Sequence, residues 1–127
     1  MEFRKFTLKS GTEIFLGKDA KTNDKLVRNY KGKENVILHT AAPGSPFCVI
    51  ENLKPKKEDI KEAAVITAAK SQDWRDNKSD IKIHKFTGKD VKKTIFMKKG
   101  SWKLKSQPKV IKIKKLDIKK WSSEQSN

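Results

Sequence analysis

The stretch KKEDIKEAAVITAAKSQDW, residues 56–74, decides the fold class of this chain. Its small and apolar side chains recur at helical spacing, and alanine, the strongest helix former, is frequent among them. The positions on this face are Ile60, Ala63, Ala64, Thr67, Ser71 and Trp74. We therefore expect one long helix over residues 56–74 that packs closely on a sheet through its small side chains.

Runs that alternate apolar with polar residues surround this stretch and predict strands, because successive side chains of a strand point to opposite faces, and two continuous apolar runs, at residues 35–40 and 47–51, predict core strands. We expect strands at residues 2–9, 12–17, 35–40, 47–51, 80–86, 101–105 and 109–115. Turn signals at residues 10–11 and 42–46 join the first four of these strands in pairs. Residues 19–30 have helical spacing, so we expect a short amphipathic helix there with Asp19 as its N-cap.

These elements predict an α+β fold, a mostly antiparallel sheet with one long helix packed on one face and a short helix near the first hairpin. We expect the other sheet face to be polar and cationic, because lysines alternate with the apolar positions of the last two strands. A single domain is expected over residues 1–116. The mostly polar residues 117–127 are expected to form a flexible tail.

The composition narrows the class of protein. A chain of 127 residues has the length of one domain. Its longest uncharged stretch, residues 35–50, contains a Pro-Gly turn and is too short to span a bilayer, and the N-terminus has no apolar segment typical of a secretory signal. Cys48 is the single cysteine, so no disulfide can form within the chain. We expect a cytoplasmic protein without a membrane partner.

The charge is strongly positive and unevenly distributed. The chain has 31 Lys and Arg against 15 Asp and Glu, a formal net charge of +16. Residues 98–120 hold ten lysines and one acid, whereas residues 51–80 are nearly balanced. A cationic region of this kind favours a polyanionic partner, and nucleic acid is the first candidate. The alternative is a solvated lysine coat without a ligand.

Signatures of catalysis and of cofactors are sparse. The sequence contains neither a GxGxxG nor a GxxxxGK[ST] loop and no cysteine pair for zinc, so we expect no cofactor and no metal. His39 and His84 are the only histidines. A small hydrolase or transferase in which His39 activates Ser45 or Cys48 remains an alternative. Because GxSxG is absent and Cys48 stands among apolar residues, we expect no enzyme.

Several short motifs follow one another along the chain: Gly11-Thr12-Glu13-Ile14, Leu38-His39-Thr40, Pro43-Gly44-Ser45, Glu62-Ala63-Ala64 and Ile81-Lys82-Ile83-His84. In this order and spacing they resemble the NFACT-R domain, the RNA-binding domain of the NFACT proteins of ribosome-associated quality control, in a stand-alone form. The resemblance covers about residues 2–116. The chain departs from the family pattern at Asp19, Ile37 and Pro46.

The resemblance implies a non-enzymatic RNA-binding module whose partner is tRNA or rRNA, with the large ribosomal subunit as a further partner. Cations on one side of the sheet would contact the RNA backbone, while His39 and Ser45 would make directional contacts, and Phe86 and Trp102 are considered for base stacking. The candidate RNA-binding residues are Lys18, Lys21, Arg28, His39, Ser45, Lys82, His84, Lys92, Lys93 and Lys99. A basic adaptor that binds DNA or acidic proteins is the remaining alternative.

Overall fold

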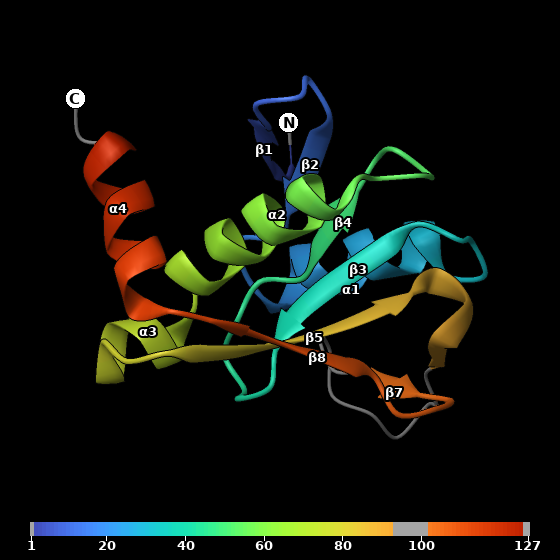
Figure 1. The fold of residues 1–127 in the computed structure, drawn as a ribbon. Coiled ribbons are helices and arrows are strands. Elements are labelled where there is room, and N and C mark those ends of the chain that lie inside the picture. Colours follow the sequence, from blue (N-terminus) through green and yellow to red (C-terminus); the bar gives the residue numbers. More distant parts are fainter. Residues whose placement is uncertain (1, 93–101, 126–127) are drawn as a thin grey trace.

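Six strands form a central sheet in the order β1-β2-β4-β3-β5-β8, and every neighbouring pair is antiparallel (Figure 1). The computed structural model describes residues 2–92 and 102–125. The strands are β1 (Arg4–Thr7), β2 (Glu13–Leu16), β3 (Val36–Thr40), β4 (Cys48–Ile50), β5 (Ile81–Thr87) and β8 (Lys109–Ile113). A second sheet pairs β6 (Val91–Lys92) with β7 (Lys103–Leu104). The prediction of an α+β fold with a mostly antiparallel sheet is confirmed.

The first face of the sheet carries the larger core. Side chains from every second strand position, among them Ile14, Leu38, Cys48 and Ile83, pack against helix α2 (Lys57–Ala69). The alanines expected to face the sheet, Ala63 and Ala64, are fully buried there. Each buried aliphatic side chain contributes about 1.5–3 kcal/mol relative to an exposed one, so this layer holds the sheet together.

The helix expected over residues 56–74 is two helices in the structure. Helix α2 ends at Ala69, and α3 (Gln72–Asn77) begins after an extended Ser71 with φ −90° and ψ 155°. The buried Ser71 hydroxyl donates to the Ala68 carbonyl at 2.7 Å and accepts the Trp74 N–H at 3.1 Å. The prediction of one continuous helix is wrong because this serine acts as an N-cap, which competes with the helical hydrogen bonds.

The second face of the sheet carries a smaller core under helix α1 (Ala20–Tyr30). Leu26 and Val27 of α1 pack there with Ile37, Val49 and other apolar residues, and the β6–β7 pair adds Val91. Asp19 caps α1, as predicted, by accepting the Thr22 N–H at 2.8 Å. The expectation of a wholly polar and cationic second face is wrong, because β3 and β4 are apolar on both sides at this end.

The end of the described chain is helical. Residues Lys115–Gln125 form α4, which packs on α2 (Figure 1). Ile118 is fully buried, and the Trp121 ring lies 6.0 Å from that of Phe6. Residues 117–125 therefore differ from the flexible tail expected for them: their composition is polar, but two apolar side chains three residues apart anchor one face of the helix. In the described part of the chain, no helix has the length and apolar character needed to span a membrane.

Candidate functional site

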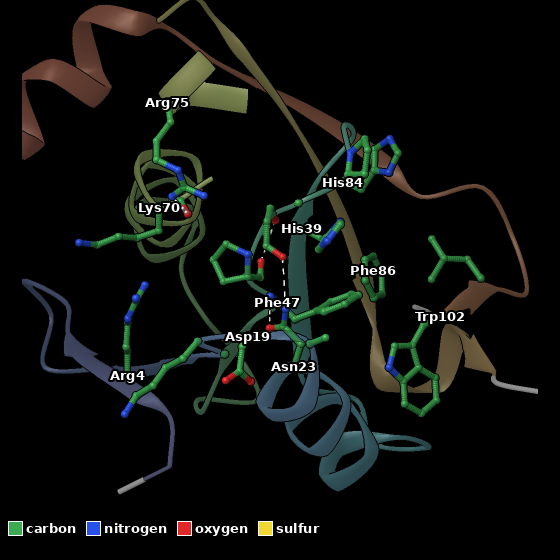
Figure 2. A pocket seen from close by; sticks show the side chains of 18 residues that line it. Arg4, Asp19, Asn23, His39, Phe47, Lys70, Arg75, His84, Phe86 and Trp102 are labelled. Carbon is green, nitrogen blue, oxygen red and sulfur yellow. Dashed lines mark hydrogen bonds between the residues drawn. The ribbon is translucent and has the colours of Figure 1, made fainter. Parts of the chain in front are cut away.

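A pocket of about 630 Å³ opens where α1, the turn at residues 43–46 and the α2–α3 junction meet the second face of the sheet. Two kinds of side chain line it. Cationic groups from four separate segments lie along one side, and aromatic rings and the two histidines line the rest (Figure 2). The cations are Arg4, Lys18, Lys70 and Arg75, and the rings are His39, Phe47, His84, Phe86 and Trp102.

The turn between β3 and β4 forms one wall of the pocket through a close contact with α3. The Gly44 carbonyl accepts the Gln72 N–H at 3.0 Å. Gly44 has φ +86°, and a Cβ atom added to it would lie 2.9 Å from the Gln72 Cβ atom. The positive φ and this close approach both favour glycine. Gly44 therefore allows the Pro-Gly turn to pack tightly against the start of α3.

Hydrogen bonds to buried polar groups hold the same turn from inside. The Ser45 hydroxyl accepts the Thr40 N–H at 3.1 Å and donates to the Pro46 carbonyl at 2.8 Å. Asn23 of α1 accepts the Phe47 N–H at 3.0 Å and donates to the Ser45 carbonyl at 3.4 Å. Ser45 and Asn23 therefore fasten the turn to β3 and α1, and the Ser45 hydroxyl is occupied by backbone partners.

His39 and His84 stand directly opposite each other on β3 and β5. The His39 ring stacks on Phe47 with 4.3 Å between the ring centroids. Burial, and to a smaller extent the nearby His84, lowers the pKa of His39 from 6.5 to about 4. Near pH 7 the His39 imidazole is therefore neutral and offers a ring face and hydrogen-bonding nitrogens rather than a charge.

The cationic side of the pocket depends on the break between α2 and α3. Arg75, on α3, donates one guanidinium N–H to the Lys70 carbonyl at 3.3 Å and another to Gln72 Oε1 at 2.9 Å. The Lys70 ammonium lies 5.7 Å from the centre of the Trp121 ring. Arg75 is thereby held near the mouth of the pocket, where Arg4 of β1 joins it (Figure 2), whereas the Lys70 ammonium is directed to Trp121, which is not part of the pocket lining.

Asp19 adds a carboxylate to the pocket lining. The Thr22 backbone N–H and side chain hydrogen-bond to this carboxylate and lower the pKa of Asp19 from its ordinary value of 3.8. The carboxylate is thus engaged in capping α1 and partly offsets the positive charge at this end of the pocket.

The two nucleophiles considered for a hydrolase are both placed unfavourably. Cys48 is fully buried on the first face of the sheet beside Leu38, whereas His39 belongs to the second face. Burial raises the pKa of the Cys48 thiol to about 12. Together with the bonded hydroxyl of Ser45, this leaves neither residue in an arrangement that His39 could activate. The described residues also contain no cluster of His, Cys, Asp or Glu that could hold a metal ion.

The structure brings four of the sequence-predicted residues together around the pocket: Lys18, His39, Ser45 and His84. The other described ones lie outside its lining. Lys21 and Arg28 are on α1, Lys82 is on β5 two residues from His84, and Lys92 is on β6. Lys93 and Lys99 lie outside the described residues.

Sequence reasoning missed Arg4, Asn23, Lys70 and Arg75, although all four line the pocket. Arg4 and Lys70 are separated by more than sixty positions, and only the tertiary fold brings their segments together. A signal for Arg75 was present, because Ser71 followed by a short polar stretch is typical of a new helix start. It was hidden by the helical spacing that continues through Trp74.

Comparisons with known proteins agree with the motifs. The sequence pattern described as NFACT protein RNA binding domain matches residues 2–106. The chain is 25% identical over 109 residues to the archaeal Rqc2 homolog aRqcH of Methanocaldococcus jannaschii, a match that covers 81% of this chain and 16% of the relative. The chain thus spans a small part of that curated relative.

A solved structure has the same fold. The C-terminal part of the fibronectin/fibrinogen-binding protein from Streptococcus suis superposes with a TM-score of 0.80 at 22% sequence identity, over 94% of this chain and 49% of that chain. The pattern match extends over most of the chain and includes the turn, both histidines and the α2–α3 junction that build the pocket. This chain therefore belongs to the family of NFACT protein RNA binding domains.

Proposed function

We propose that this chain is a non-enzymatic, cytoplasmic RNA-binding module of ribosome-associated quality control that binds tRNA or the large-subunit rRNA. Its family supports an RNA ligand, and the match to an Rqc2 homolog supports the pathway. The observation that carries the proposal is the row of cations from β1, α2 and α3 that meet at one pocket on a chain of net charge +16. Separate segments converging on one place are more consistent with a binding site than with a uniform lysine coat.

The basic surface extends from the pocket along the open end of the second face. Lys82 on β5 pairs in register with Lys112 on β8, two positions along from His84 and Val110. Alternate residues of a strand lie on the same face of the sheet. Lys82 and Lys112 therefore lie on the same face as His84, which lines the pocket. An RNA backbone that lies across this end would meet the pocket cations first and this lysine pair next.

The contacts available on this surface favour shape recognition over sequence reading. Lysine and arginine side chains contact phosphates without discriminating between bases, so they set affinity and orientation. A folded RNA, whose backbone turns sharply, presents more phosphates to a concave cationic site than a straight duplex does. This argument favours tRNA or a structured rRNA element as the ligand.

The proposal is tested by measuring the affinity of the purified protein for deacylated tRNA, rRNA fragments and duplex DNA of matched length across a salt series. We expect tighter binding to one of the RNAs, with log K falling by roughly 0.7–0.9 per log unit of salt for each phosphate contacted. Equal and weak binding to all of these polyanions would contradict the proposal. Preferential binding of the DNA would instead favour the DNA-binding adaptor.

A further inference from the structure

The pocket is divided chemically along its length. In Figure 2, Arg4, Lys70 and Arg75 lie on one side, and His39, Phe86 and Trp102 lie on the other. Contacts to backbone phosphates alone would involve only the cationic side and would not explain the aromatic side. The volume of about 630 Å³ is in the range of pockets that bind small ligands.

The aromatic side offers ring surfaces of restricted mobility. The His39 ring is stacked on Phe47, which is itself packed edge to face against Phe86 with 6.4 Å between centroids. Trp102, on the same side of the pocket, is partly exposed and lies under the Arg28 guanidinium at 5.8 Å from its ring centre. Aromatic rings held in this way can stack on a base, and stacking tolerates any of the four bases.

The cationic side offers donors suited to one phosphate group. The guanidinium of Arg75 is oriented by its hydrogen bonds to the Lys70 carbonyl and to Gln72. A planar guanidinium can bind two phosphate oxygens at once, and neighbouring ammonium and guanidinium groups add charge. His39 is neutral near pH 7 because its pKa is lowered. The positive charge of the pocket therefore comes from the cationic side, and His39 contributes only a ring surface to the aromatic side.

We infer that the pocket captures one unpaired nucleotide of the bound RNA, with its base stacked on the aromatic side that includes His39 and Trp102 and its phosphate held by Arg75 and Arg4. This inference rests on the proposed function and deepens it, because it gives the RNA ligand a specific feature, a nucleotide unstacked from its helix. Paired nucleotides keep their bases in the duplex and cannot enter a pocket. The domain therefore distinguishes RNA with a single-stranded end, bulge or loop from fully paired RNA.

The test compares three RNAs on the intact protein. One is a blunt, fully paired duplex, the second is the same duplex with a two-nucleotide 3′ overhang, and the third carries abasic residues in that overhang. We expect the overhang to bind roughly 5- to 150-fold more tightly than the blunt duplex, the range that stacking of one base provides. The abasic overhang, which keeps the phosphates and loses the bases, should bind as the blunt duplex does.

Variants of pocket residues test whether the preference for the overhang RNA arises at the pocket. Trp102→Leu should abolish the preference for the overhang over the blunt duplex, whereas Trp102→Phe, which keeps an aromatic ring, should retain most of the preference. If Trp102→Leu fails to fold, the abasic RNA still decides the question with the unaltered protein. Arg75→Ala removes a cation that holds the phosphate and should weaken binding of the overhang RNA, whereas Lys119→Ala, which removes one charge on α4 outside the pocket lining, should not.

The outcomes separate this inference from the proposed function. Equal affinity for all three RNAs would overturn the nucleotide pocket while leaving RNA binding intact, and failure to bind any of them would overturn RNA binding itself. Adenosine monophosphate serves as a free-nucleotide probe. If it binds as tightly as the overhang RNA, the pocket takes a free nucleotide and the inference is wrong; much weaker binding supports it.

Discussion

Single buried polar residues give the pocket its shape. Ser45 and His39 are predicted from the sequence as direct RNA contacts; in the structure the Ser45 hydroxyl bonds to two backbone groups, whereas the His39 ring packs on Phe47 and lines the pocket. A side chain that satisfies a buried N–H cannot also bind a ligand without leaving that group unpaired. Ser45 therefore positions the turn, and the exposed cations Arg4 and Arg75, which no motif contains, provide the charge of the pocket.

Ser45→Ala should lower the free energy of unfolding by about 1–3 kcal/mol, because the buried Thr40 N–H would lose its acceptor. The loss is measured by urea denaturation. The exposed Ser79→Ala is the matched control and should change stability by less than about 0.5 kcal/mol. A Ser45→Ala protein as stable as the parent would show that the hydroxyl does not support the turn.

His39 should make the protein less stable in mild acid. Its pKa is lowered from 6.5 to about 4 in the folded state, so below pH 6.5 the unfolded chain binds a proton that the folded chain does not. Stability therefore falls as the pH drops from 6.5 toward 4, by roughly 1.5–2 kcal/mol between pH 6.5 and 5. Denaturation curves at several pH values measure this slope.

The substitution His39→Gln should flatten the slope between pH 6.5 and 5, since it removes the titrating group. His84→Gln is the control and should keep most of the slope, because burial is the largest cause of the His39 shift and the charge of His84 a smaller one. A slope that persists unchanged in His39→Gln would mean that another group is responsible.

Among the secondary-structure elements, the strands and helix α1 were predictable, whereas the break after α2 and helix α4 were not. Alternating apolar and charged residues predict β2, β5 and β8 because their side chains meet a core on one face and a different environment on the other. Helical spacing predicts the α2 region but passes over the break at Ser71, since a serine fits both a helix face and an N-cap. The lysine-rich composition of residues 115–125 concealed the anchoring role of Ile118.

Ser71→Ala should lower stability by about 0.5–2 kcal/mol through the loss of the α3 cap. Because α3 carries Arg75 and contacts the turn at Gly44, RNA affinity should fall as well, by more than the loss of folded protein explains. Denaturation and binding measured on the same preparation separate the two effects. Ser71→Thr, which keeps a hydroxyl that can donate to the Ala68 carbonyl and accept the Trp74 N–H, should restore most of the stability; failure of this variant to exceed Ser71→Ala would argue against the cap.

Ile118→Ala should destabilise the protein by about 2–5 kcal/mol, because this fully buried side chain of α4 packs into the larger core. Leu116→Ala on the same helix is the matched control, since that side chain is 70% exposed, and it should cost under about 1 kcal/mol. Thermal or chemical unfolding compares the pair. Equal and small effects would show that α4 contributes little to the fold.

The two faces of the sheet have different roles: the first contributes the larger core, and the second forms part of the pocket. The first face is covered by α2 and α4, while the second is covered by α1 and β6–β7 at one end and opens into the pocket at the other. Composition predicts the polyanionic partner, because a net charge of +16 is a property of the entire chain. The location of the pocket could not be predicted, since Arg4, Lys70 and Arg75 become neighbours only through the order of strands and the break between α2 and α3.

The most direct test of the central claim, that RNA binds at the pocket, compares two double variants with the same net charge. Arg4→Glu with Arg75→Glu alters the pocket, whereas Lys57→Glu with Lys119→Glu alters exposed residues of α2 and α4 outside its lining. If RNA binds at the pocket, tRNA affinity falls at least tenfold more in the first double variant than in the second, with a shallower salt dependence. Equal losses in the two would contradict it, because RNA binding would then depend on total charge and not on this site.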